Sequence, residues 1–148
     1  MSQYHRHTIV PLDIIMPAIK AGWNDPGAKM KFQEWTFNIH SLRLRTFCRC
    51  RGNLVCSCCG LKAQYFAVES FKHGSPNSVH INLYGRADGK EILFTHDHTL
   101  ARSLGGKDNM SNTTVMCSPC NSRKAAEESK ELNRRRKENE NQQPVSQG

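Results

Sequence analysis

The stretch "THDHTLARSLGGKDNMSNTTVMCSPCNSRK", residues 95–124, gathers the side chains that decide the fold of this chain. Near its start an aspartate lies between two histidines, at 96–98, and a Cys-x-x-Cys pair, Cys117 and Cys120, follows later. A histidine and aspartate cluster of this kind either holds a metal ion for chemistry or decorates a surface hairpin. The other cysteines of the chain and its overall charge bear on that choice.

The seven cysteines are odd in number, and we expect a reducing compartment, so a disulfide framework is not expected. Their spacing indicates a metal instead, because Cys56 and Cys59 form a second Cys-x-x-Cys pair. Two such pairs predict one tetrahedral zinc site with four thiolate ligands. The alternative is that one pair is accidental and its thiols are merely buried. The long gap between the pairs predicts a β-rich insertion.

Three further cysteines have no single assignment. Cys58 lies inside the first pair and could replace Cys56 or Cys59 as a ligand. Cys48 and Cys50 have no clear partners, so they are either free thiols or part of a second site.

Composition and charge favour a small protein with a polyanionic partner. The 148 residues predict one domain with appendages, and a hydrophobic content of 37% predicts a small core that a metal would help to stabilise. The formal net charge of +8 favours nucleic acid as the partner. The chain has no run of roughly 18 apolar residues, so no transmembrane helix is predicted. The N-terminus lacks the charged-then-apolar order of a secretory signal. We therefore expect a cytoplasmic protein.

Residues 1–46 are expected to form an N-terminal extension that is partly helical. "NDPG" at 24–27 predicts a turn. Phe32, Trp35, Ile39 and Leu42 then follow at spacings of three and four, which predicts an amphipathic helix. A basic run precedes the first cysteine pair and is either a solvated face or a phosphate contact; it comprises Arg43, Arg45, Arg49 and Arg51.

Residues 47–125 are expected to form the functional domain. A strand is predicted at 61–70, and an Asp-Gly turn joins two alternating apolar runs into a hairpin that ends at 98. A loop should follow, and a helix should begin near Ser118 and carry a Glu131–Arg135 pair. The remaining segment, 126–148, is expected to hold the helix end and a disordered polar tail.

The order of these features resembles the HNH endonuclease family, in its zinc-knuckle form known from phage and homing nucleases. The pattern "DH…GG…N…CxxCNxxK" is matched over about residues 54–125 by Asp97-His98, Gly105-Gly106, Asn112, Cys117, Cys120, Asn121 and Lys124. The resemblance implies an α+β fold, a small ββα-metal domain that is treble-clef-like. Thr99 and Ala101 depart from the apolar residue and proline that usually follow the family's histidine, which puts the stiffness of the loop in question.

The chemistry of these side chains leads to the same hypothesis. Phosphodiester cleavage needs an activated water and neutralised charge on the phosphate. Asp97 and Asn121 offer the oxygen ligands that Mg²⁺ or Mn²⁺ prefers, and neutral His98 can accept a proton from water as a general base. The resemblance implies that Asn112 fixes the loop after His98. The catalytic ion and the zinc would be distinct, because four thiolates leave no open position.

Several basic side chains near these residues are candidates for contacts with DNA. They are His96, Arg102, Lys107, Arg123 and Lys124. His96 shares a strand face with His98, so it could equally be an extra ligand or a solvent-facing neighbour.

Three functions remain in competition on the sequence alone. The first is a metal-dependent DNA endonuclease. The second is a zinc-stapled, catalytically weak or inactive DNA-binding or regulatory protein of phage type, working with DNA or with other phage or host proteins. The third is a zinc module for protein or RNA contacts. The joint presence of Asp97, His98 and Asn121 favours the first, since an inactive relative is expected to lose at least one of them.

Overall fold

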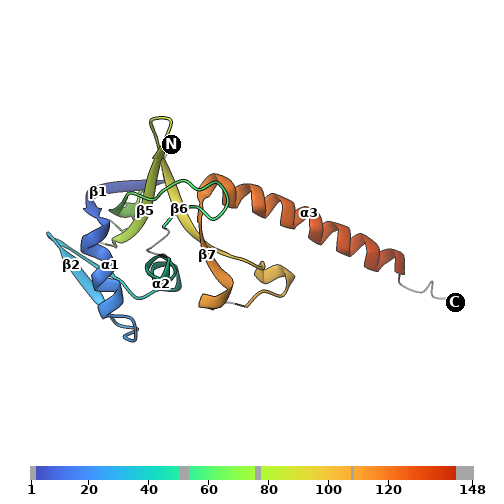
Figure 1. The fold of residues 1–148 in the computed structure, drawn as a ribbon, viewed down its shortest axis with the longest axis horizontal. Coiled ribbons are helices and arrows are strands. Elements are labelled where there is room, and N and C mark those ends of the chain that lie inside the picture. Colours follow the sequence, from blue (N-terminus) through green and yellow to red (C-terminus); the bar gives the residue numbers. More distant parts are fainter. Residues whose placement is uncertain (1–2, 51–53, 76–77, 108, 143–148) are drawn as a thin grey trace.

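The computed structural model describes residues 3–50, 54–75, 78–107 and 109–142 and shows a mixed α+β fold (Figure 1). In chain order the helices and strands are β1 (Tyr4–Pro11), α1 (Leu12–Ala21), β2 (Lys29–Phe32), β3 (Trp35–Asn38), α2 (Leu42–Arg49), β4 (Tyr65–Phe71), β5 (His80–Ala87), β6 (Lys90–His98), β7 (Thr113–Cys117) and α3 (Ser118–Gln142). Two single 3-10 turns, at Arg102–Leu104 and Met110–Asn112, interrupt the connection between β6 and β7.

Within the described residues the main sheet has five strands in the order β1-β4-β5-β6-β7, all antiparallel. Its first edge strand comes from the N-terminal segment, which is therefore part of the central sheet and not an appendage to it. The expected boundary at 46/47 falls inside α2, and the one at 125/126 falls inside α3.

The predicted helix through Phe32, Trp35, Ile39 and Leu42 is wrong. β2 and β3 form a separate antiparallel hairpin in which Phe32 pairs with Trp35. The turn between them holds Gln33 at a φ of 54°. The apolar residues fit a spacing of three and four, but KMKF also alternates lysine with apolar side chains, and this period of two is the pattern of a half-buried strand.

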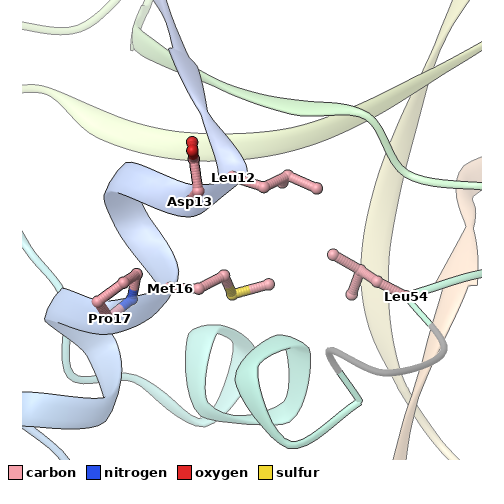
Figure 2. Close-up of a pocket in the computed structure, with 5 residues that line it drawn as sticks. All are labelled: Leu12, Asp13, Met16, Pro17 and Leu54. Carbon is pink, nitrogen blue, oxygen red and sulfur yellow. The ribbon is translucent and has the colours of Figure 1, made fainter.

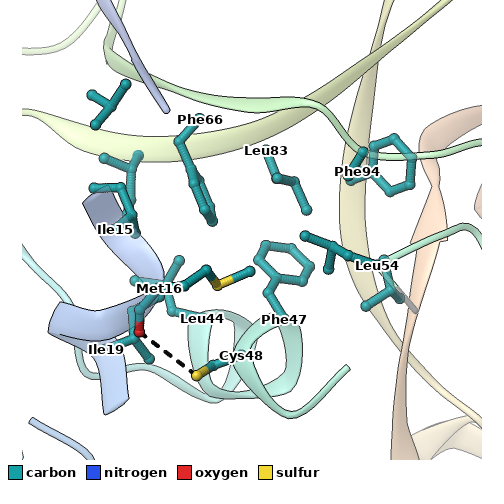
Figure 3. Packing of buried hydrophobic residues seen from close by; sticks show 14 of the residues in the cluster. Ile15, Met16, Ile19, Leu44, Phe47, Cys48, Leu54, Phe66, Leu83 and Phe94 are labelled. Carbon is teal, nitrogen blue, oxygen red and sulfur yellow. Dashed lines mark hydrogen bonds between the residues drawn. The ribbon is translucent and has the colours of Figure 1, made fainter. Parts of the chain in front are cut away.

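Helices α1 and α2 cover one face of the sheet and form the core with it. Figure 3 shows side chains of α1 (Ile15, Met16, Ile19) and α2 (Leu44, Phe47, Cys48) facing Phe66, Leu83 and Phe94 of the strands. The α2 helix begins at a Ser41 cap whose hydroxyl accepts from the Leu44 amide at 3.1 Å. Burying a side chain such as Phe47 stabilises the fold by roughly 1.5–3 kcal/mol, so α2 is firmly held on the sheet.

Strand alternation assigns the remaining side chains to the other face. Leu83 and Phe94 point into the core, so their neighbours Asn82 and Thr95 point away from it. Asp97 shares the face of Thr95. The beginning of α3 lies on this second face, because Asn121 donates to the Thr95 hydroxyl at 3.1 Å.

The predicted Asp-Gly hairpin is confirmed, with Asp88 and Gly89 joining β5 to β6. Both residues have positive φ values, 53° and 73°, as a two-residue hairpin turn of the primed type requires. The predicted loop after His98 contains an unpredicted strand, β7, which pairs with the end of β6 from Phe94↔Cys117 to His98↔Thr113.

The predicted helix from Ser118 is also confirmed, and it runs on to Gln142 as α3. Figure 1 shows its C-terminal part extending away from the sheet. The predicted pair is present there, with Arg135 Nε 3.0 Å from Glu131 Oε1. The polar tail expected to be disordered comprises residues 140–148; residues 140–142 belong to α3, and 143–148 lie outside the described residues. No helix in the described part of the chain is long and apolar enough to cross a membrane.

Candidate active site and metal centre

The two cysteine pairs meet at one place in the fold. Cys117 ends β7 and Cys120 lies in the first turn of α3, where they approach Cys56 and Cys59. The four sulfur atoms lie within 4.8 Å of one another, so these cysteines could hold a metal ion. The Sγ atoms of Cys59 and Cys117 are 3.8 Å apart. Four sulfurs at about 2.3 Å from a central zinc would be separated by roughly this distance, so the arrangement fits a tetrahedral site.

The surroundings of the cysteine cluster favour a thiolate at Cys56, whereas burial raises the pKa of Cys117. The backbone amides of Cys58 and Cys59 point at Cys56 Sγ from 3.4 and 3.5 Å. Burial alone would raise the pKa of Cys56, but backbone hydrogen bonds outweigh it and lower the pKa to about 6. An Arg123 guanidinium nitrogen lies 3.0 Å from Cys120 Sγ and adds positive charge.

The other cysteines lie outside this cluster. Cys58 is exposed, although its amide takes part. Cys48 is buried in the core, with its thiol 3.8 Å from the Met16 carbonyl oxygen.

A second polar cluster lies between the end of β6 and the first turns of α3. Lys124 Nζ is 2.5 Å from Asp97 Oδ2 and 3.2 Å from Glu128 Oε1, and it also donates to the carbonyls of His98 and Thr99. Partial burial would lower the pKa of Lys124, but its hydrogen bonds and the negative charge of both carboxylates raise it. The lysine is therefore a fixed cation beside Asp97.

Asn121 reaches the same interface one turn earlier on α3. It donates to Thr95, which is two residues before Asp97 on the same face of β6. Because Asn121 and Lys124 are three residues apart on the helix, they also share a face. The fold thus brings Asp97 and Asn121 to one strand–helix interface.

His98 lies on the opposite face of β6 from Asp97. It pairs with Thr113 of β7, whose hydroxyl is 2.8 Å from the Thr46 hydroxyl of α2. The rings of His96 and His98 are neighbours there, with centroids 5.7 Å apart. The two adjacent residues Asp97 and His98 therefore flank the end of the strand, one toward α3 and one toward α2.

Arg49 is a basic residue that the sequence did not single out. Its Nη2 donates to the Thr113 carbonyl at 2.5 Å, so its exposed side chain lies next to the pairing partner of His98. The only sequence signal was its membership of the basic run before the first cysteine pair.

Asn112 ties the loop that joins β6 to β7. Its side-chain oxygen accepts from the Leu100 amide at 2.9 Å, and its amide nitrogen donates to the carbonyls of Leu100 and Lys107 at 3.0 and 2.7 Å. Its backbone oxygen accepts from the Thr99 amide at 2.7 Å. One residue thus holds both ends of a loop that lacks the stiffening proline.

Asn112→Ala should loosen this loop, because three side-chain hydrogen bonds are lost. We expect amide exchange at residues 99–107 to rise at least about tenfold, with each lost bond weighing on the order of 1 kcal/mol. Hydrogen exchange by mass spectrometry measures this. Asn109→Ala is the control, because the Asn109 side chain accepts only from Ser111 at 2.7 Å. Equal exchange in both variants would contradict the role of Asn112.

The other predicted DNA contacts are differently placed. Lys124 and Arg123 are engaged with Asp97 and Cys120, as described above. Lys107 is exposed on the loop, and His96 is partly buried beside His98. The side chain of Arg102 lies outside the described residues.

A cavity lined mainly by apolar side chains lies elsewhere, near the core. Figure 2 shows a cavity of about 360 Å³ where Leu12 and Met16 of α1 point toward Leu54, while the Asp13 carboxylate points away from them. Such a lining offers little to a polar substrate, so the polar cluster at β6 and α3 is the better candidate.

A comparison with protein families bears on the segment that contains this cluster. Residues 86–137 match the family model of HNH endonucleases. This part of the chain is similar to an HNH domain. No curated protein and no solved structure is significantly similar to the chain.

The match to the HNH domain covers β6, β7 and most of α3, and with them Asp97, His98, Asn112 and Asn121. It indicates nuclease activity in general. Cys56 and Cys59, as well as β1, α1, α2 and β4, lie outside the matched residues.

Proposed function

We propose that the chain is a metal-dependent DNA endonuclease that hydrolyses phosphodiester bonds. The observation that carries the proposal is the meeting of Asp97 and Asn121 at the β6–α3 interface, with His98 at the adjacent position, inside residues that match the HNH family. His98 is assigned the general base, which takes the proton from the attacking water. Asn112 keeps the loop after His98 in place.

Asp97 and Asn121 are assigned to hold Mg²⁺ or Mn²⁺. A carboxylate and an amide oxygen suit such hard ions, and two protein ligands leave room for water and phosphate. The bound ion supplies Lewis-acid stabilisation of the departing 3′ oxygen. Lys124 shares the Asp97 carboxylate, so it would lie beside the ion and close to the negative charge of the phosphate.

Cys56, Cys59, Cys117 and Cys120 are assigned to a structural zinc ion. The separation of their sulfurs and the lowered pKa of Cys56 support this assignment. The ion would join the segment before β4 to the β7–α3 corner, which holds Asn121 in position. Four thiolates close the site, so this ion has no part in the cleavage.

The ion pair between Lys124 and Asp97 favours a second candidate function. A carboxylate already neutralised by an ammonium group needs no divalent ion, which fits a DNA-binding protein that does not cut. The two candidates differ in one measurable property, the dependence of strand cleavage on Mg²⁺ or Mn²⁺.

Incubation with supercoiled plasmid tests the proposal. The purified protein should convert it to nicked or linear DNA in Mg²⁺ or Mn²⁺, and omission of the divalent ion should stop the reaction. Intact plasmid under all conditions, together with DNA binding in a gel shift, would support the second candidate.

Binding to DNA should weaken steeply with salt, because phosphate contacts dominate the interaction of a chain with a net charge of +8. We expect the affinity for duplex DNA to fall at least about 100-fold between 50 and 200 mM salt, as several phosphate contacts imply. Fluorescence anisotropy measures this. Lys107→Gln, which removes an exposed charge, should reduce the slope of log K against log salt by about one. A flat salt dependence would argue against DNA as the partner.

A further inference from the structure

The main sheet separates between β5 and β6. The ladder between these strands runs from Ala87↔Lys90 to Leu83↔Phe94. Beyond the paired residues of this ladder, β5 continues along β4, while β6 turns to pair with β7. A cavity of about 410 Å³ opens where they part, which is within the size range of small-ligand pockets.

Arg43 of α2 extends into this gap. Its guanidinium donates to the Ile81 carbonyl at 2.6 Å and to Asn82 Oδ1 at 3.3 Å. In the described part of the chain no carboxylate forms an ion pair with it. A guanidinium has five N–H donors, so some remain for a ligand. Burial lowers the pKa of Arg43, which reflects a positive charge removed from water without a direct counter-ion.

The nearest carboxylate does not compete for Arg43. Glu69 is buried and accepts from Arg6 Nη2 at 2.9 Å and from Asn82 Nδ2 at 2.7 Å. Its hydrogen bonds therefore go to Arg6, which also pairs with Glu91, and to Asn82, and not to Arg43. Arg43 therefore presents its positive charge to the cavity that it lines, which suits an anionic ligand.

Aromatic rings form the outer wall of the cavity. The centroids of Tyr4 and Phe71 are 5.2 Å apart, and His80 lies 5.3 Å from Tyr4 and 5.0 Å from Phe71. Phe71 is 52% exposed. An exposed phenylalanine beside a partly buried cation offers a stacking surface next to a phosphate contact, the combination that single-stranded nucleic acids bind.

Thr95 joins this cavity to the proposed catalytic residues. It lines the cavity, and its hydroxyl accepts from Asn121 at 3.1 Å. Asp97 is two residues further along β6, or about 7 Å. Two stacked nucleotides of one DNA strand rise by the same amount. A strand whose phosphate lies at Asp97 can therefore place a neighbouring nucleotide in the cavity.

We propose that the gap between β5 and β6 binds one unpaired nucleotide of the DNA substrate, close to the phosphate that is cut. Arg43 receives its phosphate, and Phe71 stacks on its base. A paired base is stacked inside the duplex and cannot reach the ring. The protein therefore prefers single-stranded or branched DNA to duplex DNA. The inference rests on the proposed function for its substrate class, but it does not require that cleavage occurs.

Phe71→Ala tests the pocket with little risk to the fold, because the ring is half exposed. Affinities for a fluorescent single-stranded oligonucleotide and for its duplex are measured without divalent ions. Phe71→Ala should lower the single-strand affinity at least about fivefold and change the duplex affinity less than about twofold. Ile14→Ala, which removes an apolar side chain of similar exposure on α1, should change neither. Equal effects of Phe71→Ala on both DNAs, or no effect, would overturn the proposal.

Arg43→Gln separates the phosphate contact from stacking. It should reduce the salt slope for single-stranded DNA by about one, provided that its melting curve matches that of the wild type. If it unfolds, the Phe71→Ala result decides alone. Cleavage of plasmid is measured separately. If Phe71→Ala affects the two DNAs differently but the protein does not cut, the nucleotide pocket is supported and the nuclease function is rejected. If the protein cuts and Phe71→Ala has no effect, the nuclease function is supported and the pocket is rejected.

Discussion

His98→Ala is expected to abolish plasmid cleavage while DNA binding and metal content stay close to those of the wild type. The side chain is assigned only to proton transfer, and removal of a general base costs about 10²- to 10⁴-fold in rate. The relevant measurement is the single-turnover cleavage rate in Mg²⁺ and in Mn²⁺, with the affinity for the same DNA measured by anisotropy. The rate should fall and the affinity should not.

His96→Ala is the matched control, because the two rings are neighbours on one strand face. If His96 contacts a phosphate, its loss should weaken binding and leave the maximal rate within about tenfold of the wild type. A His98→Ala protein that cuts at the wild-type rate would remove the basis for the general-base assignment. If both variants lose the cleavage rate to the same extent, proton transfer would have to be assigned to His96 and His98 together.

Cys117→Ser is expected to release the metal and unfold the domain. Structural zinc contributes roughly 10–16 kcal/mol in small peptides, which is comparable to the whole stability of a domain, about 5–15 kcal/mol. We expect the zinc stoichiometry to fall well below one and Tm to drop by at least about 10 °C. Metal analysis and thermal unfolding measure the two effects.

Cys58→Ser is the control for the cluster. Cys58 lies in the same turn but is exposed and outside the group of four. It should keep its zinc and its Tm. If instead Cys58→Ser loses the metal and Cys117→Ser keeps it, the ligand set is wrong. The control also separates loss of a ligand from a general effect of losing a thiol.

The residues of the β6–α3 region could be predicted because local patterns determine them. The Asp-Gly turn sets the hairpin, and the two cysteine pairs predicted the approach of segments that are distant in the chain. These signals need only a few residues at fixed spacing. The contacts of Asn112 with Leu100 and Lys107 agree with the expectation that this residue fixes the loop after His98. The assignments of Asp97, His98 and Asn121 to catalysis stay predictions.

Other features depend on tertiary contacts that spacing does not reveal. The apolar residues of the β2–β3 hairpin satisfy both periods, so their spacing also fits a helix. The short strand β7 has no turn signal of its own and forms because the end of β6 offers it a partner. The role of Lys124 beside Asp97 arises only when α3 folds back on the sheet, so the sequence suggested a phosphate contact instead.

The pairing of β1 with β4 limits how the segment that matches the HNH family can be moved between proteins. The family match starts at residue 86, yet the strand that borders the sheet is supplied by residues 4–11. A shortened version that began at the matched segment would lose β1, β4 and most of the hydrophobic interior, and its open backbone would invite aggregation. Grafting or recombination of the matched segment therefore has to carry the strands and helices that precede it in the chain.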